Sequence, residues 1–264
     1  MPVPFSEINF IDIDQEHMLG HVHSLVAGSV VDGPGIRYVI FLQGCQFRCQ
    51  YCHNRDTWDM REGKLYSVAE LVDETLKYTR FFDRSHGGVT VTGGEALLQA
   101  TYVDLLFKQL HKMDIHTCLD TNGYASPQLY RGVLDSLLDN TDLVLLDIKQ
   151  MDPKKHLALT EVDNERTLTF AKHLAEREQT TRIRYVVVPG FTDDLDDIRQ
   201  MADFIAPMKN IERVELLPYH AMGEHKWQDL GFDYPLKDVP SPTAEKMQQI
   251  KSMLEIQYGF RVLL

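Results

Sequence analysis

The sequence lacks any apolar run long enough to cross a membrane. Its longest runs, at residues 38–42 and 143–146, have the length of a β-strand. Positive charge is also scarce, because 27 Lys and Arg residues stand against 39 Asp and Glu residues, a formal net charge of −12. A negative field repels phosphate backbones, so we expect neither nucleic acid nor a membrane as a partner. Residues 1–18 carry several acids and no basic leader pattern, and we interpret them as an N-terminal extension rather than a secretory signal.

Cysteine is rare, with four residues in a chain of 264. That number is too small for a disulfide scaffold in a chain of this length, and the reducing cytoplasm is the expected compartment. Three of the four, Cys45, Cys49 and Cys52, fall within eight residues. Their spacing is therefore more informative than their number.

No stretch rich in Pro, Gly or Ser divides the chain, so we predict one domain over residues 19–264. Its pattern alternates short β-rich runs with helical periodicity, which is typical of an α/β fold with parallel strands. The run at residues 143–147 is apolar on both faces, as a strand covered by helices requires. Ser67 and Glu70 form a predicted capping box, and Ser126 before Pro127 predicts a second helix start. The predicted strands are residues 21–27, 36–42, 89–92, 116–120, 143–147, 182–188, 214–217 and 260–264, and the predicted helices are residues 67–82, 101–113, 126–138, 166–177, 195–208 and 243–258.

Polar or glycine-rich segments follow successive predicted strands at the end where each strand finishes. In parallel α/β barrels the loops at this end build the active site. A single segment of this kind is equally well explained as a turn, but the repetition along the chain favours a shared site. The segments are the cysteine cluster and residues 93–95, 120–122, 147–149, 189–190 and 218–220.

The CxxxCxxC cluster at residues 45–52 admits four interpretations. Burial of three separate cysteines is improbable when the chain has so few, and a zinc site lacks a second cysteine pair downstream. Cys49 to His53 also matches the CxxCH haem-attachment pattern, which leaves Cys45 unexplained. The fourth interpretation is a [4Fe–4S] cluster, in which three thiolates hold three irons and one iron has no cysteine ligand. We expect the remaining cysteine, Cys118, to be a packing residue.

CxxxCxxC with an aromatic residue before the last cysteine resembles the signature of radical S-adenosylmethionine (SAM) enzymes. Several further segments, in the same order along the chain, resemble the pyruvate formate-lyase activating enzymes. The resemblance runs from about residue 20 to the C-terminus. The segments are DGPGIR at 32–37, QGC at 43–45, YCHNRDTWD at 51–59, GGEA at 93–96, HTCLDTNG at 116–123, YVVVPG at 185–190 and LLPYH at 216–220.

The resemblance implies a role for individual residues. Cys45, Cys49 and Cys52 would hold the cluster, and Arg184 is a further candidate partner for the SAM carboxylate. A monovalent cation is implied beside that carboxylate, held by Asp120, Thr121, Asp147 and the carbonyl of Leu145. The SAM contacts implied are Tyr51, Cys52, His53, Gly93, Gly94, Glu95, Asp147, Ile148, Lys149 and His220.

The resemblance also implies the reaction, the partners and the detailed fold. A [4Fe–4S] cluster would cleave SAM reductively to methionine and a 5′-deoxyadenosyl radical, which generates a glycyl radical on pyruvate formate-lyase. We expect a partial (β/α)6 barrel, open on one side to admit a glycine loop of that protein, and a flavodoxin or ferredoxin as electron donor. No general acid or base is required. The segment 32–37 resembles the loop that contacts the glycine segment, although its spacing alone favours an ordinary Gly-Pro turn.

Two alternatives remain open. The chain lacks further cysteines between Cys52 and Gly93, where many activases of other glycyl radical enzymes carry an inserted ferredoxin-like segment. This absence favours pyruvate formate-lyase as the substrate, with activation of another glycyl radical enzyme as the nearest alternative. A more remote alternative is an iron–sulfur electron carrier, whose cluster would not respond to SAM.

Overall fold

One curved sheet organises the molecule in the computed structural model, which describes residues 17–264. The strands of this part follow the spatial order β3-β1-β2-β4-β5-β6-β7-β8-β9, so β3 and β9 are the two edges and do not pair with each other. The strands are β1 (Leu19–Ser29), β2 (Arg37–Leu42), β3 (Lys64–Ser67), β4 (Gly88–Gly93), β5 (His116–Thr121), β6 (Leu143–Asp147), β7 (Thr181–Val187), β8 (Ile211–Pro218) and β9 (Val262–Leu263).

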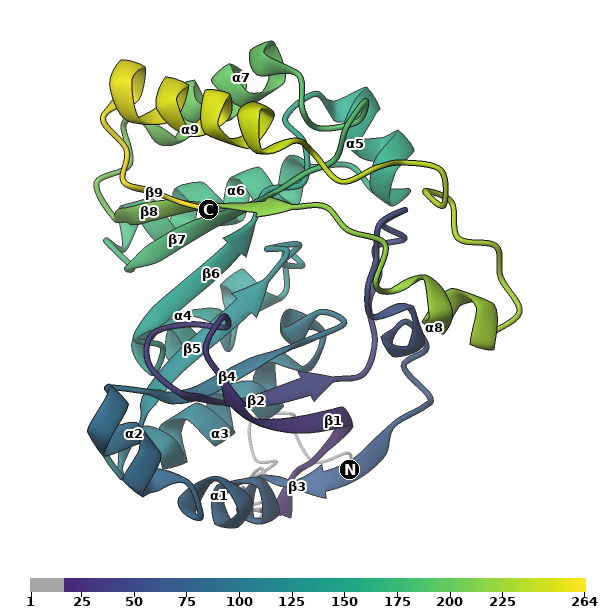
Figure 1. Cartoon of the computed structure of the whole chain (residues 1–264). Helices are drawn as coiled ribbons and strands as arrows, with labels where there is room; N and C mark the ends of the chain where they lie inside the picture. Colours follow the sequence, from purple (N-terminus) through teal and green to yellow (C-terminus); the bar gives the residue numbers. More distant parts are fainter. Residues whose placement is uncertain (1–16) are drawn as a thin grey trace, which may run out of the picture.

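Along the spatial order β2-β4-β5-β6-β7-β8-β9, each strand pairs in parallel with the next. Figure 1 shows this sheet curved into a barrel wall with the helices on its outer side. Because the two edges do not meet, the predicted open α/β barrel is confirmed. Strands β1 and β3 pair antiparallel at one edge, an addition that makes the sheet mixed. Of these two, β3 was missed because four residues are too few to show a period.

The helices follow the predicted periodicity with two changes. The segment predicted as one helix over residues 67–82 is two helices, and the helix predicted from Ser126 begins at Leu134 after a 3₁₀ turn. Helices α5 and α8 were not predicted. The helices are α1 (Val68–Leu76), α2 (Thr79–Ser85), α3 (Ala100–His111), α4 (Leu134–Asp139), α5 (Pro153–Thr160), α6 (Glu165–Glu176), α7 (Leu195–Ile205), α8 (Glu224–Asp229) and α9 (Ala244–Tyr258).

The predicted capping box at the start of α1 is present. The Ser67 hydroxyl accepts a hydrogen bond from the Glu70 backbone N–H, and the Glu70 carboxylate accepts one from the Ser67 backbone N–H at 2.7 Å. These bonds satisfy backbone donors that have no partner inside the helix. Helix α1 thereby starts at a defined point and lays Leu71 and Val72 against the core.

The main core lies between the outer face of the sheet and the helices, and it buries alternate residues of the central strands, as at Tyr38, Ile40 and Leu42 of β2. The residues at 1–16, which include most of the predicted N-terminal extension, lie outside the described part of the chain. Within residues 17–264 no helix is long and apolar enough to cross a membrane.

Candidate functional site

The three clustered cysteines lie on the loop that follows β2, and all three are free thiols. The last turn of α5 holds this loop from outside, because the Thr160 carbonyl accepts from the Arg48 N–H at 2.8 Å and the Leu159 carbonyl from the Gln50 N–H at 3.0 Å. The Arg48 guanidinium donates back to the Cys45 carbonyl at 2.7 Å. The unpredicted helix α5 therefore fixes the shape of the cysteine loop.

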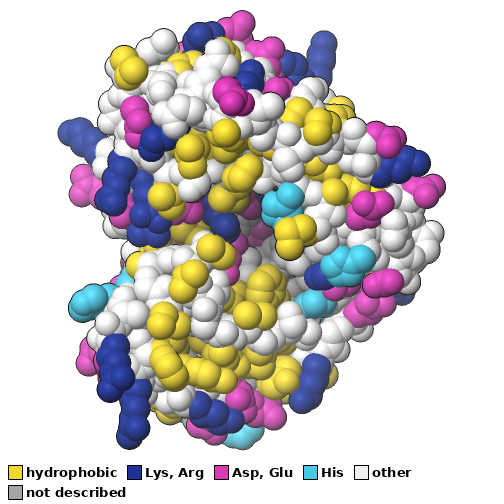
Figure 2. Space-filling view, in the orientation of Figure 1, with side chains coloured by type: hydrophobic (Ala, Val, Ile, Leu, Met, Phe, Trp, Pro, Cys, Tyr) yellow, Lys and Arg dark blue, Asp and Glu magenta, His cyan; other side chains and the backbone are white. Residues whose placement is uncertain are grey.

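A cavity of about 480 Å³ opens at the carboxyl ends of the parallel strands and is lined by all three thiols. Figure 2 shows the molecule hollowed between its two halves, with hydrophobic side chains gathered near the rim. Most of the residues predicted as a site from different strand ends line this single cavity, as the barrel geometry requires. Of the predicted cluster and SAM residues, those lining the cavity are Cys45, Cys49, Tyr51, Cys52, His53, Gly93, Gly94, Asp147, Lys149 and His220.

Two predicted SAM contacts, Glu95 and Ile148, do not line the cavity. The Glu95 carboxylate is buried and accepts hydrogen bonds from the Thr121 hydroxyl, the Asn122 N–H and the Leu97 N–H. Burial raises the pKa of Glu95 to about 7, although these hydrogen bonds favour its charged form. The side chain of Glu95 thus ties the end of β4 to the end of β5.

Glycine is required where β4 meets the cysteine loop. Gly93 has a φ of +117°, and a Cβ on Gly94 would lie 2.1 Å from the Gly44 carbonyl oxygen. That same carbonyl accepts from the Glu95 N–H at 2.7 Å. Any side chain at Gly94 would separate the two backbones, so the pair of glycines sets how near the cysteine loop lies to the strand ends.

Four charged side chains line the same cavity as the cysteines. Arg184 donates to Asp120 at 3.0 Å, and Lys149 donates to Asp147 at 2.7 Å. Burial raises the pKa of Asp120 despite Arg184, while Asp147, Tyr51 and Cys49 raise that of Lys149 against the effect of its burial. Asp120 Oδ1 is buried without a hydrogen-bond partner, which leaves it available to a ligand.

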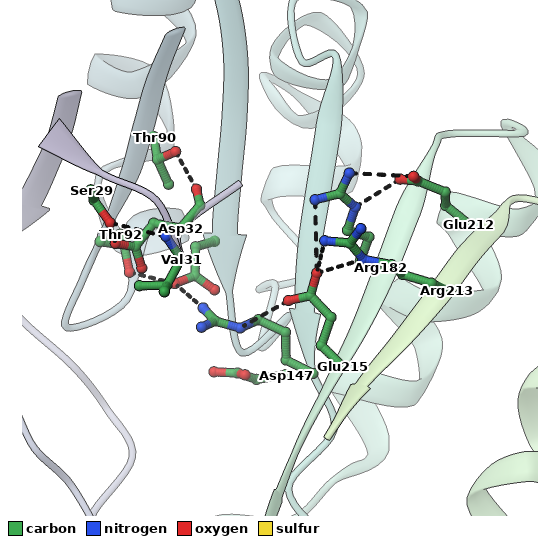
Figure 3. A network of polar contacts seen from close by, with 12 residues as sticks. Ser29, Val31, Asp32, Thr90, Thr92, Asp147, Arg182, Glu212, Arg213 and Glu215 are labelled. Atoms are coloured by element: carbon green, nitrogen blue, oxygen red, sulfur yellow. Dashed lines mark hydrogen bonds and ion pairs between the residues drawn. The ribbon is translucent and has the colours of Figure 1, made fainter. Parts of the chain in front are cut away.

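Further charged side chains lie next to Arg184 on β7 and β8. Glu215 accepts from Arg213 at 2.6 Å and lies 3.8 Å from Arg184, and Arg182 bridges Glu215 and Glu212 (Figure 3). Arg184 therefore faces acids on two sides, and these raise its pKa although burial lowers it. The sequence analysis missed Glu215, and an acid at an inward strand position was the available signal.

The segment that follows β8, residues 219–229, contacts the cysteine loop at its last cysteine. The rings of His53 and His220 stack with centroids 4.4 Å apart, and His53 Nε2 lies 2.8 Å from the His220 carbonyl oxygen. The Trp227 indole N–H donates to the Cys52 carbonyl at 2.9 Å. Helix α8, which carries Trp227, thereby holds the cysteine loop in place.

The loop between β1 and β2 reaches into the cavity. Val31 and Asp32 line the cavity, and the Asp32 carbonyl accepts from the Thr90 hydroxyl at 2.6 Å. Thr90 in turn accepts from the buried guanidinium of Arg37 at 2.9 Å. The DGPGIR segment is therefore held inside the barrel by its own arginine and is more than a turn between strands.

No group of three His, Cys, Asp or Glu side chains within residues 17–264 converges closely enough to hold one metal ion. A cluster with one thiolate per iron places its sulfur ligands farther apart than a single ion does. Burial raises the pKa of all three thiols, so they stay protonated unless bound iron displaces the protons.

Cys118 is buried with Leu143 and Leu145 and does not line the cavity. Other residues that line it were not assigned by the sequence analysis. Asn122 Nδ2 lies 4.0 Å from Cys45 Sγ, and Thr92 donates to Asp120 at 2.7 Å. Asn122 lies in a segment quoted above and Thr92 ends a predicted strand, so their positions were available from the sequence but their contacts were not.

Comparison with known proteins places this geometry in context. The family model described as the radical SAM superfamily matches residues 39–205. The chain is 49% identical over 246 residues to the pyruvate formate-lyase 1-activating enzyme of Escherichia coli (strain K12), covering 93% of this chain and 99% of that protein. It is 46% identical over 232 residues to the pyruvate formate-lyase-activating enzyme of Staphylococcus aureus (strain USA300), covering 87% and 92%.

Solved structures share the architecture. A domain of pyruvate-formate lyase-activating enzyme from Bacteroides vulgatus aligns with a TM-score of 0.55 and 28% identity, covering 67% of this chain and 98% of that chain. Streptococcus suis SuiB bound to precursor peptide SuiA aligns with a TM-score of 0.60 and 17% identity, covering 85% and 47%. At that identity the second likeness concerns the fold alone.

Proposed function

The chain belongs to the radical SAM superfamily and, within it, to the pyruvate formate-lyase activating enzymes, and from this premise we propose that it generates the glycyl radical of pyruvate formate-lyase. The observation that carries the proposal is the convergence of three thiols and five strand ends on one cavity. When bound, a [4Fe–4S] cluster and SAM supply reductive cleavage of a carbon–sulfur bond, which yields methionine and a 5′-deoxyadenosyl radical.

The residues present fit a cluster. Cys45, Cys49 and Cys52 are free, line the same cavity and have no competing disulfide partner. Trp227 and the end of α5 hold their loop by backbone contacts, so the three thiols are preorganised. Three thiols leave one iron for the amino and carboxylate groups of SAM.

The residues present also fit SAM. Gly93 and Gly94 leave the backbone at the end of β4 unshielded by side chains, where a methionine amino group can approach it. Lys149 and Arg184 supply positive charge for the carboxylate, each already oriented by its own Asp. Tyr51, His53 and His220 offer aromatic faces for the adenosine. Glu95 joins the ends of β4 and β5, and the Ile148 N–H donates to the Arg184 carbonyl at 3.1 Å, so both act by holding the strand ends that contact the cofactor.

We further propose a monovalent cation at Asp120, Thr121 and Asp147, with the carbonyl of Leu145. The unpartnered Oδ1 of Asp120 is the oxygen that supports this site. Arg184 and Lys149 already neutralise the two carboxylates, so a singly charged ion suits the site better than a divalent one.

The protein substrate reaches the cavity from the open side of the barrel. Val31 is 69% exposed at the mouth, and Asp32 lies beside it on the loop held by Arg37 and Thr90. We propose that this loop contacts the glycine segment of pyruvate formate-lyase and excludes water around the reacting carbon. A flavodoxin or ferredoxin as the electron donor, and the cytoplasm as the compartment, remain predictions from the sequence.

One experiment tests the function directly. Anaerobically reconstituted, reduced protein is mixed with pyruvate formate-lyase and SAM, and the glycyl radical is followed by EPR. We expect the radical to form and the EPR signal of the reduced cluster to change when SAM is added. An unchanged cluster signal would favour the electron-carrier alternative, and SAM cleavage without a radical would favour a different glycyl radical enzyme as the substrate.

A matched series assigns the ligands. Cys45→Ala, Cys49→Ala and Cys52→Ala should each lose the cluster and all SAM cleavage, whereas Cys118→Ala should retain both. Cys118 is a suitable control because it is buried outside the cavity. Equal loss in the Cys118 variant would contradict the assignment of ligands.

A further inference from the structure

A second hollow, of about 610 Å³, lies against the cysteine loop and outside the main cavity. It is formed by the loop from Cys45 to Arg61 together with Leu98. The cofactor and substrate residues described above, Cys45 excepted, do not line it. The hollow is therefore a separate surface, which has no role in the reaction proposed above.

The two hollows share one thin wall. Cys45 and Trp58 are the two residues that line both of them. A cluster held by Cys45 would therefore lie behind this wall, with Cys45 and Trp58 also facing the outer hollow. Such a wall gives an electron a short path from outside, without opening the cavity that holds SAM and the glycine segment.

The outer hollow is positively charged in a negatively charged protein. Arg48, Arg55 and Arg61 line it with one acid, Asp59, while the whole chain has a formal charge of −12. Arg61 pairs with Asp59 at 2.6 Å, but Arg48 and Arg55 have no carboxylate partner within residues 17–264. Two cations are therefore left uncompensated at this hollow.

Aromatic and apolar groups complete the surface. The Arg55 guanidinium lies 4.0 Å from the centroid of Trp58 and 4.3 Å from that of Phe232. Met60 and Leu98 are 40% and 43% exposed and lie in the same hollow. An apolar centre bordered by arginines is the composition of a protein interface.

We propose that this hollow is the docking site of an acidic one-electron carrier protein. The inference rests on the proposed function, because the reaction consumes one electron for each SAM cleaved. The reduced prosthetic group of the carrier loses that electron, and the cluster behind Cys45 and Trp58 gains it, with no proton or group transferred. Charge complementarity selects an acidic carrier, and the protein substrate keeps the open side of the barrel.

The test uses cluster-loaded protein and a reduced flavodoxin as the probe. Calorimetry gives the Kd, and stopped-flow absorbance gives the rate of cluster reduction without SAM. The double variant Arg55→Gln, Arg61→Gln should weaken binding and slow reduction by about tenfold at low salt. Added salt should shrink the difference from the wild type, because it screens surface charges.

Two controls separate charge from structure. The double variant Lys77→Gln, Arg199→Gln removes the same charge from paired surface cations elsewhere and should bind flavodoxin like the wild type. Arg55→Lys keeps the charge and should also retain binding. Arg48 stays unchanged because it holds the Cys45 carbonyl.

The outcomes are distinguishable. If both double variants weaken binding equally, or if Arg55→Lys weakens it as much as Arg55→Gln, a docking site at this hollow is excluded. Reduction by a small photochemical reductant should be the same in wild type and variants. Failure of the wild type to cleave SAM with that reductant would instead overturn the proposed function.

Discussion

Near their carboxyl ends, the two faces of the parallel strands have opposite chemistry. On the outer face, neighbouring strands place Val91, Leu119, Leu146 and Ile183 in the core beneath the helices. On the inner face, the next residues along the same strands are polar or charged, as at Thr92, Asp120, Asp147 and Arg184. The sheet thus divides stability and chemistry between its two sides.

This division explains why the inner charges are tolerated. A buried charge is costly unless it is paired. Asp120 pairs with Arg184, and Glu215 lies among Arg182, Arg184 and Arg213 (Figure 3). Because the apolar outer face stabilises the barrel, the inner face can carry a ladder of charges that contacts ligands.

The largest expected effect is a loss of stability caused by a substitution on the outer face. Leu119→Ala removes a fully buried side chain and should lower the free energy of unfolding by about 2–5 kcal/mol. Denaturant unfolding of the metal-free protein measures the loss. Binding of SAM to the surviving folded, cluster-loaded protein should be unchanged, and a large fall in affinity would show that the two faces are not separable.

A pH effect at Glu95 comes next. Its folded-state pKa of about 7 exceeds the ordinary value of 4.5, so folding favours the protonated form. Protonated Glu95 therefore adds to the free energy of unfolding, fully below about pH 4.5. This addition, at most roughly 3 kcal/mol, is lost as the pH rises to about 7.

Glu95→Gln removes the titrating group at nearly the same volume. As the pH rises from 5 to 7, the free energy of unfolding of the wild type should therefore fall relative to that of the variant. Parallel urea titrations across this range measure it. A constant difference would show that Glu95 is ionised throughout, held by the donors from Leu97, Thr121 and Asn122.

A smaller effect should follow at the residue beside Leu119 on the opposite face. Asp120→Asn keeps the shape but removes the charge that faces Arg184 at 3.0 Å. We expect SAM to bind about tenfold more weakly, a change of about 1.4 kcal/mol, with a smaller loss of stability than in Leu119→Ala. Calorimetry and denaturant unfolding measure the two quantities, and the reverse ranking would contradict the division of faces.

The smallest effect lies in the outer helix layer, far from the cavity. Ser67→Ala removes the hydroxyl that caps α1 and should cost about 1 kcal/mol of stability. Glu70→Gln retains a side-chain acceptor for the Ser67 N–H and should cost less. Thermal unfolding compares them. SAM cleavage at matched folded fractions should not change in either variant.

Much of this architecture could be predicted from local patterns. The continuous apolar run at residues 143–147 identified β6 with its observed bounds, and Ser67 with Glu70 located the start of α1. Helix α5 escaped prediction because its periodicity is weak, although Asp152 before Pro153 is the same kind of start signal as Ser126 before Pro127. Of the inner charges of β7 and β8, Arg184 was predicted, whereas Arg182 and Glu215 were missed because their ion pair forms between neighbouring strands.

The sequence by itself determined the family, the fold class and the identity of the clustered thiols, because ligand spacing and strand periodicity are local properties of the chain. The tertiary structure alone decided which strand-end residues share the cavity. It turned Glu95 toward Thr121, placed Trp227 on the Cys52 carbonyl and made Cys45 and Trp58 a wall between two hollows. Contacts between residues far apart in sequence depend on how the sheet curves, and no local pattern carries that information.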